Sequence, residues 1–218
     1  MAGPDCSKGV VESVILPFMS ILTRPLPGLP FRPARPLTVD EYHGLLKIGA
    51  LTSGAPYEFL EGWLIPKMSR NPAHDLSLSL VNKVISRVLP SEWFARVQSA
   101  ITTADSEPEP DVAVVLSPER QYVDHHPGPS EIGLVIEVAD SSLPEDRGVK
   151  SCIYSRAGIA EYWIVNIADR QVEVYTDPTG PADEPDYQTE NIFSEGGSVP
   201  LILGGNSIGI IAVSDVLP

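Results

Sequence analysis

The sequence has few cysteines and no long apolar run, and these absences exclude several classes of protein. Its 218 residues include two cysteines, Cys6 and Cys152, which are too few for a disulfide framework or a thiolate zinc site. A membrane-spanning helix needs about eighteen or more apolar residues in succession, and no such run occurs. The apolar stretch VVESVILPFMSIL is interrupted by Glu12 and Pro17 and lacks the features of a secretory signal. We therefore expect a soluble, cytoplasmic protein.

Two kinds of sequence motif are also missing. The chain has no Walker A pattern and no G-x-G-x-x-G, so nothing in it indicates a nucleotide-binding protein. The adjacent histidines His125 and His126 lie in a segment that contains proline and glycine, and no H-E-x-x-H pattern is present. We therefore do not expect a zinc site at these histidines.

Basic residues are scarce, and their distribution along the chain is uneven. The formal net charge is −14, and no Lys or Arg follows Arg170, whereas eight acidic residues do. Residues 1–170 hold the other 21 acidic residues and all 15 basic ones, a net charge of −6. This balance argues against binding through a broad basic surface, and any anionic partner must contact the earlier part of the chain. A solvated acidic surface that aids solubility is the simpler interpretation.

The chain divides into a proline-rich arm and one larger domain. Residues 1–36 contain seven prolines, which favour extended or polyproline conformations over a packed element. Residues 37–218 carry the periodic patterns of a globular domain, although the part beyond residue 176 is acidic and rich in glycine and proline. We predict an arm at 1–36 and a single domain at 37–218.

Apolar spacing predicts an α/β domain of mixed α+β type. Helical periods and helix-start residues predict helices at 37–48, 71–89 and 142–157, the last opened by a capping box of Ser142 and Glu145. The second helix carries an apolar stripe that we expect to be buried, namely Leu76, Leu80, Val81, Val84, Ile85 and Val88. Strand-like runs lie at 57–68 (a hairpin that turns at Glu61 and Gly62), 93–100, 111–116, 133–139, 161–167, 171–176, 187–193 and 207–213.

Two of the predicted buried strands carry a carboxylate. Asp111 stands at the start of the apolar run DVAVVL, and Glu137 lies inside LVIEVA. An unpaired charge buried in such a strand is unstable, so each carboxylate needs a hydrogen-bonded partner, a cation or a solvent-filled cleft. If the two strands are neighbours, both carboxylates lie at one edge of the sheet. Hard cations such as Mg²⁺ prefer oxygen ligands of this kind and would stabilise both charges.

The predicted helix after Glu137 contains a basic residue with two interpretations. Asp146 and Lys150 are spaced i, i+4, on a face close to Val149 and Ile153. On one interpretation they form an ordinary surface pair worth roughly a few tenths of a kcal/mol, which is what the spacing alone favours. On the other, the lysine ammonium reaches the metal cleft, where it orients water or stabilises charge on a phosphate.

Four segments of the chain form a recognisable set: YEFLEG, EPDVAVV, LVIEVADSS and DRGVKSCIYSRAGIAEYWIV. Together they resemble the Uma-two family of endonucleases, which has the restriction-endonuclease-like fold of the PD-(D/E)XK nuclease superfamily. The similarity covers about residues 38–215. The resemblance implies a restriction-endonuclease-like central mixed sheet flanked by helices. It further implies phosphodiester hydrolysis on nucleic acid, DNA more than RNA, that depends on Mg²⁺ or Mn²⁺.

The resemblance also implies roles for individual residues. Asp111 matches the aspartate of the PD motif, and Glu137 matches the acidic residue of the (D/E)XK motif, both of them metal ligands. Two positions after the glutamate, where many of these nucleases have lysine, this chain has Ala139. Lys150 matches the lysine that the family places on the next helix instead.

Residues from the earlier part of the chain complete the implied site. Glu58 matches an acidic residue that binds metal through water, with Glu61 as a competing candidate at the predicted turn. His74 stands where similar proteins carry histidine, so we weigh a place in the cleft against an ordinary helix-start histidine. Asp146 is the other candidate for the cleft.

The arm suggests a way to form the homodimer that the resemblance implies. Its apolar stretch is unfavourable in water, and the proline-rich run after it acts as a semi-rigid spacer. Docking on a neighbouring subunit would bury this stretch, and packing on its own domain is the equally favoured alternative.

Two functions remain open on the sequence. The first is a metal-dependent nuclease that uses Glu58, Asp111, Glu137 and Lys150. The second is a catalytically inactive protein of the same fold, kept as a binding or regulatory module. The acidic balance favours the second, whereas the complete set of four residues favours the first. We take the nuclease as the working hypothesis.

Overall fold

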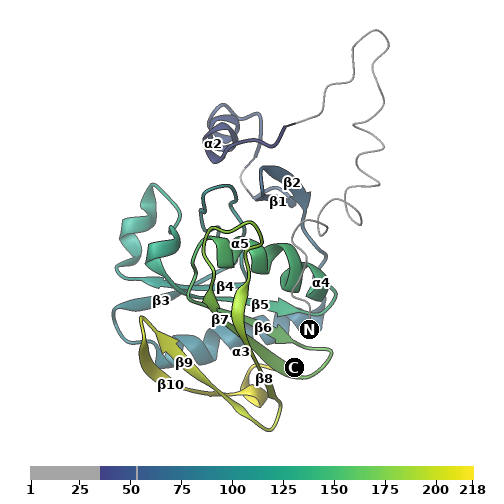
Figure 1. Ribbon diagram of the computed structural model, residues 1–218, viewed down its shortest axis with the longest axis vertical. Coiled ribbons are helices and arrows are strands. Elements are labelled where there is room, and N and C mark those ends of the chain that lie inside the picture. The colour runs from purple at the N-terminus through teal and green to yellow at the C-terminus, as the bar shows by residue number, and fades with distance from the viewer. Residues whose placement is uncertain (1–34, 53) are drawn as a thin grey trace.

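A six-stranded mixed sheet forms the centre of the molecule (Figure 1). The structure is a computed structural model that describes residues 35–52 and 54–218. In order across the sheet, its strands are β3 (Trp93–Val97), β4 (Val112–Leu116), β5 (Ile132–Ala139), β6 (Glu161–Asn166), β7 (Gln171–Pro178) and β8 (Tyr187–Ser194). β5 and β6 run parallel and the other neighbours run antiparallel. A parallel pair needs a long crossover between its strands, and this crossover carries part of the candidate site.

Helices and two hairpins surround the central sheet. Before it come α2 (Val39–Lys47), β1 (Tyr57–Leu60), β2 (Trp63–Pro66) and α3 (Pro72–Val88). The crossover from β5 to β6 consists of α4 (Leu143–Glu145), a π-helical segment (Asp146–Lys150) and α5 (Ser151–Arg156), and the chain ends with β9 (Ser198–Leu203) and β10 (Asn206–Ala212). Short 3₁₀ turns lie at Glu119–Val123, Pro129–Glu131 and Val213–Asp215. Within the described residues, no helix is long and apolar enough to cross a membrane.

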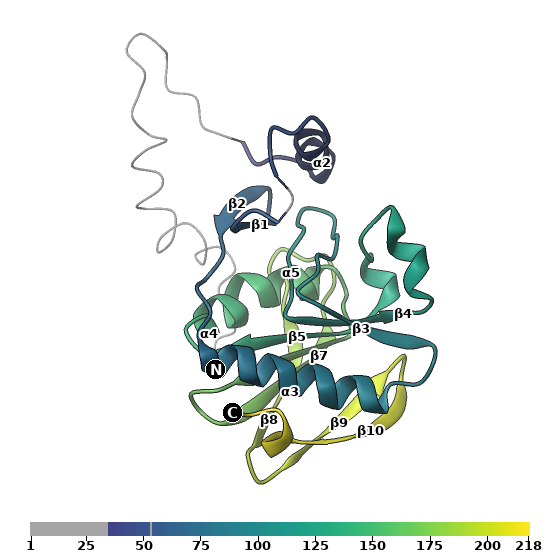
Figure 2. The ribbon, with the colours of Figure 1, turned by 180° about the vertical axis from the view of Figure 1, so that it is seen from behind.

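Apolar side chains pack on both faces of the sheet. α3 and the β9–β10 hairpin cover one face (Figure 2), where Val81 and Ile85 pack in a cluster with Leu134. α5 and the β1–β2 hairpin cover the other face, where Tyr154 packs in a cluster with Val135. Burying each large side chain of this kind stabilises the fold by about 1.5–3 kcal/mol. Since β5 lies between the two layers, all of its residues are buried, which explains its nearly continuous apolar sequence.

The first predicted helix and hairpin form as expected. The Thr38 hydroxyl accepts a hydrogen bond from the Glu41 N–H, and the Glu41 carboxylate accepts one from the Thr38 N–H. This capping box starts α2. The hairpin turns at Glu61 and Gly62, whose φ angles of 50° and 82° are left-handed. A Cβ at position 62 would lie 2.3 Å from the Pro36 Cβ, so the turn requires glycine for space as well as for its backbone conformation.

The predicted buried stripe of α3 is partly wrong. Val81 and Ile85 are buried as expected, but Leu76 is 51% exposed. Leu78 and Ser77 are buried in its place, and the Ser77 hydroxyl donates a 2.6 Å hydrogen bond to the Val216 carbonyl. The carboxyl-terminal segment therefore packs on the first half of the helix and sets which face is inside.

The predicted capping box of Ser142 and Glu145 is also wrong. The Ser142 hydroxyl caps no backbone N–H and instead donates a 2.6 Å hydrogen bond to the Asp146 carboxylate. Hydrogen bonds to a carboxylate are stronger than those to neutral groups, and this carboxylate is buried. The single helix predicted at 142–157 is divided into α4, the π-helical segment and α5.

The acidic carboxyl-terminal part contains one strand more than predicted. β8 and β10 match the expected runs at 187–193 and 207–213, whereas β9, which contains Pro200, was not expected. β9 belongs to a two-stranded hairpin and so has an open edge, where proline is tolerated. The arm predicted at 1–36 lies almost wholly outside the described residues and stays a prediction.

Candidate active site

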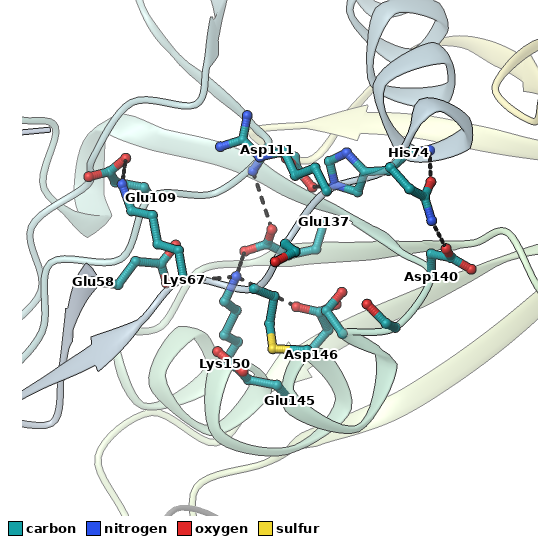
Figure 3. A pocket seen from close by; sticks show the side chains of 16 residues that line it. Glu58, Lys67, His74, Glu109, Asp111, Glu137, Asp140, Glu145, Asp146 and Lys150 are labelled. Atoms are coloured by element: carbon teal, nitrogen blue, oxygen red, sulfur yellow. Dashed lines mark hydrogen bonds and ion pairs between the residues drawn. The ribbon is translucent and has the colours of Figure 1, made fainter. Parts of the chain in front are cut away.

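A pocket opens to solvent beside β5, between the β1–β2 hairpin, the start of α3 and the crossover to β6 (Figure 3). Its lining includes all six residues that the sequence predicted for the site: Glu58, His74, Asp111, Glu137, Asp146 and Lys150. Glu61 is not part of the lining, and its carboxylate binds the Arg156 guanidinium outside the pocket. Of the two alternatives for the N-terminal carboxylate, the structure therefore brings Glu58 into the pocket.

Asp111 and Glu137 lie side by side on neighbouring strands. Val112 pairs with Ile136 in the antiparallel register of β4 and β5, which places Asp111 next to Glu137. The Asp111 N–H donates a 3.3 Å hydrogen bond to Glu137 Oε2, and the Val138 N–H donates a 2.9 Å hydrogen bond to Asp111 Oδ2. These reciprocal contacts fix both carboxylates, which are 8% and 3% exposed, at one edge of the sheet.

Lys150 places its ammonium among three carboxylates. Its Nζ lies 3.1 Å from Glu137 Oε1, 3.6 Å from Asp146 Oδ1 and 3.9 Å from Glu58 Oε2. Figure 3 shows these side chains pointing toward one another. Lys150 and Asp146 are both buried, so the interpretation as an ordinary surface pair is wrong.

Tyr154 is a site residue that the sequence analysis missed. Its hydroxyl donates a 2.7 Å hydrogen bond to Glu137 Oε1, the oxygen that also binds Lys150. Tyr154 follows Lys150 by four residues, which is about one helical turn. This spacing was the signal that could have indicated it.

His74 joins α3 to the carboxylates. Its Nε2 lies 3.0 Å from Asp111 Oδ2, and its backbone N–H donates a 3.0 Å hydrogen bond to the Asn71 side chain, which caps the helix. The Asn71 amide donates a hydrogen bond to the carboxylate of Asp140, which also lines the pocket. Hydrogen bonds thus attach the first turn of α3 to Asp111 and to Asp140, both of which line the pocket.

The surroundings shift the pKa values of Asp111 and Glu137 in opposite directions. Burial acts to raise the pKa of Asp111, but the hydrogen bond and charge of His74 outweigh it and leave that pKa below its usual value. Burial raises the pKa of Glu137 to about 7, against the opposing effect of Lys150. Asp111 is therefore ionised at neutral pH, whereas Glu137 exchanges a proton there.

Burial also shifts the pKa values of Lys150 and of the carboxylates around it. It raises the pKa of Glu58, and it raises that of Asp146 to about 6. For Lys150 itself burial acts to lower the pKa, but Glu137, Glu58 and Asp146 together raise it well above its usual value. The site therefore holds a permanent ammonium beside Glu137 and Asp146, whose pKa values burial raises to about 7 and about 6.

The donor set suits a cation that needs few protein ligands. Within the described residues, no group of three or more His, Cys, Asp or Glu side chains is arranged to hold a metal ion. Mg²⁺ usually binds through one or two carboxylates and completes its octahedron with water and substrate phosphates. From the part of the chain that the structure describes, Asp111 Oδ1 and Glu137 Oε2 accept only the long hydrogen bonds of 3.4 Å from Gln98 and 3.3 Å from the Asp111 N–H. Both oxygens therefore keep lone pairs, and the two carboxylates fit such an ion.

One motif typical of serine hydrolases lies away from this site. Gly205–Gly209 has the G-x-S-x-G pattern of serine hydrolases. That motif needs a sharp turn from a strand into a helix, whereas Ser207 lies in β10 of a hairpin. The pattern therefore carries no hydrolase site.

Comparison with known proteins identifies the family. Residues 39–211 match Uma2, described as "Putative restriction endonuclease". The chain belongs to this family. The resemblance found in the sequence is thus confirmed, with nearly the bounds expected from the motifs. No match was found among curated proteins.

A solved structure shares the fold. It is the crystal structure of "a putative nuclease belonging to DUF820 from Anabaena variabilis ATCC 29413", with a TM-score of 0.62 and 19% sequence identity over 83% of this chain and 97% of that chain. At this identity the likeness establishes the fold alone. The predicted architecture, a central mixed sheet flanked by helices in a nuclease-type fold, is confirmed.

Proposed function

We propose that this protein is a nuclease of the PD-(D/E)XK type, which hydrolyses phosphodiester bonds of nucleic acid with Mg²⁺ or Mn²⁺. One observation carries the proposal: Asp111 and Glu137 lie side by side at a sheet edge, in a pocket that also contains Lys150. Membership of a family described as restriction endonucleases supports it. DNA is the preferred substrate class, because that description names DNA-cleaving enzymes.

Asp111 and Glu137 would hold the metal ion. Bound there, Mg²⁺ or Mn²⁺ would supply an activated water and stabilise negative charge on the phosphate. The low pKa of Asp111 keeps one ligand ionised at neutral pH. Glu137 accepts hydrogen bonds from Lys150 and Tyr154 through Oε1, which leaves Oε2 directed toward Asp111.

Lys150 and Glu58 would act on the substrate side of the pocket. The Lys150 ammonium is buried and stays charged, so a phosphate beside Glu137 would meet a strong, preoriented positive charge. Glu58 lies 3.9 Å from that ammonium and is placed to orient it or to bind the metal through water. Asp146 restrains the same ammonium from the other side, at 3.6 Å.

An inactive binding module is the second candidate, favoured by the net charge of −14.

An activity test separates the two functions. The full chain is incubated with plasmid DNA, single-stranded DNA and RNA in the presence of Mg²⁺, Mn²⁺ or EDTA. The Asp111→Asn variant tests the site, and Asp215→Asn, an exposed aspartate outside the pocket, is the matched control.

The nuclease proposal predicts cleavage with Mg²⁺ or Mn²⁺ and none with EDTA. Loss of a group that stabilises the transition state lowers the rate by about 10²–10³-fold. The cleavage rate of Asp111→Asn should therefore be lower than that of the wild type by at least this factor, and the rate of Asp215→Asn should equal that of the wild type. Nucleic-acid binding without cleavage by the wild type would select the binding module. Equal cleavage by both variants would show that Asp111 is not in the active site.

A further inference from the structure

The pocket carries much more negative than positive charge. Seven carboxylates line it, and its basic side chains, apart from His74, are Lys67, Arg70 and Lys150. An anionic ligand approaching such a surface is repelled unless a cation faces it. An incoming phosphate must therefore contact one of these three cations.

Two of the three cations already have carboxylate partners. Lys150 is buried within 3.1–3.9 Å of three carboxylate oxygens. Lys67 is half-buried, and its Nζ lies 2.6 Å from Glu109 Oε2. A phosphate that recruits either side chain must compete with an existing ion pair.

Arg70 differs from both in exposure and in pairing. It lines the pocket but is exposed to solvent, and its side chain makes no hydrogen bond or ion pair with any residue that the structure describes. Its charge is therefore the one at this pocket that is not already balanced by a neighbour. The guanidinium group presents a planar fork of N–H donors that matches a phosphate in a bidentate geometry.

The residue after Arg70 is held to the site by hydrogen bonds, although the side chain of Arg70 makes none with the described residues. The following residue, Asn71, caps α3 through the His74 N–H and donates a hydrogen bond to Asp140. His74 in turn contacts Asp111 at 3.0 Å. Arg70 therefore projects from a point that is connected, through two residues, to the proposed metal ligands.

We propose that Arg70 binds a backbone phosphate of the nucleic-acid substrate, next to the phosphodiester that is cleaved. This inference rests on the proposed nuclease function and adds to it a substrate-binding residue. Lys150 would act at the reacting phosphate, and Arg70 would hold the strand at the rim of the pocket. Because few cations face the pocket, this one contact carries a large share of the electrostatic affinity.

Binding experiments with the full chain test the inference. The affinity for a fluorescent DNA duplex and for the single strand is measured by anisotropy at several NaCl concentrations, with Ca²⁺ in place of Mg²⁺. The variants are Arg70→Gln and Arg70→Lys. Arg87→Gln is the matched control, because Arg87 is an exposed arginine near the other end of α3 and outside the pocket. Steady-state cleavage with Mg²⁺ supplies a second readout.

Loss of one phosphate contact should weaken binding several-fold and reduce the slope of log Kd against log[salt] by about 0.7–0.9. Arg70→Gln should show both changes and raise KM with kcat nearly unchanged, because the contact is made equally in the ground and transition states. Arg70→Lys should recover part of the affinity. Arg87→Gln should match the wild type.

The two proposals fail in different ways. If the wild type binds DNA and Arg70→Gln has the same Kd and salt slope, the role of Arg70 is overturned and the nuclease proposal stands. If the wild type neither binds nor cleaves DNA or RNA, the proposed function is overturned and the role of Arg70 with it.

Discussion

The ammonium of Lys150 lies 3.1 Å from a carboxylate oxygen of Glu137, although one residue belongs to the crossover and the other to the strand that it leaves. Both side chains are buried, and each is the strongest single influence that favours the charged form of the other. Removing one member of a buried ion pair leaves an uncompensated charge and is strongly destabilising.

Lys150→Met should abolish nucleic-acid cleavage and destabilise the protein. Without the ammonium, Glu137, Asp146 and Glu58 repel one another, and losses of about 3–5 kcal/mol are typical for a broken buried pair. Chemical denaturation measures the stability, and cleavage is assayed below the unfolding range. Lys83→Met, on the exposed surface of α3, is the control. Cleavage at the wild-type rate would remove Lys150 from the mechanism.

Asp111→Asn should weaken Mn²⁺ binding by at least tenfold while the fold stays intact. The substitution removes a negative charge from one of the two proposed ligands and keeps an oxygen that can accept the Val138 N–H. Isothermal titration calorimetry measures the affinity, and circular dichroism checks the fold. Asp215→Asn should bind Mn²⁺ as the wild type does. Equal affinities for all three proteins would contradict a metal site at Asp111.

Tyr154→Phe should weaken metal binding by about tenfold, the lower end of the effect of losing a hydrogen bond to a metal ligand. The hydroxyl orients the Glu137 carboxylate at 2.7 Å. Tyr187→Phe is a close control, because that buried hydroxyl also donates one hydrogen bond, to the Ile159 carbonyl. Both variants should lose about 1 kcal/mol of stability. A similar metal affinity in both would make Tyr154 purely structural.

Glu161 should make stability depend on pH independently of the active site. Burial raises its pKa to about 7, and the Trp163 indole N–H donates a 2.7 Å hydrogen bond to Glu161 Oε1. Because the folded-state pKa lies above the unfolded value of 4.5, the protonated form favours the fold, and this stability is lost as pH rises through about 7. The difference in Tm between Glu161→Gln and the wild type should therefore grow in favour of the variant as pH rises from 5 to 8. A constant difference in Tm across this range would refute the shift.

The arm at 1–36 should hold the protein in a dimer. Exposure of its apolar stretch to water is unfavourable, and docking on a second subunit would bury this stretch. Deleting residues 1–36 should shift the mass measured by light scattering toward that of a monomer. A dimer that survives the deletion would show that the arm is dispensable, and a monomeric full-length chain would dispose of the prediction.

The placement of Asp111 and Glu137 was predictable because their strands are nearly continuous apolar runs. A charge inside such a run is conspicuous, and strands of this kind are buried within a sheet, although the sequence left open whether the two strands are neighbours. The family motifs added Lys150 and Glu58, which spacing alone did not single out. Both side chains line the pocket.

The details around Lys150 were not predictable from local patterns. Ser142 followed by Glu145 has the form of a capping box, but the buried carboxylate of Asp146 takes the serine hydroxyl. Leu76 has helical spacing with the buried stripe of α3, yet the carboxyl-terminal segment covers Ser77 instead. In both cases a tertiary contact from elsewhere in the fold outweighs a local preference.

The π-helical turn at Asp146–Lys150 has an evolutionary consequence. Such a turn contains one residue more than a regular α-helical turn would, and a single deletion that restored the regular helix would rotate Lys150 by about 100° around the axis, away from Glu137. The strands and the apolar layer between the sheet and α3 would be untouched, whereas Tyr154 in α5 would rotate together with Lys150. A single deletion in this turn would therefore dismantle the proposed active site and leave the central sheet in place, which is a direct route from the proposed nuclease to a binding protein of the same fold.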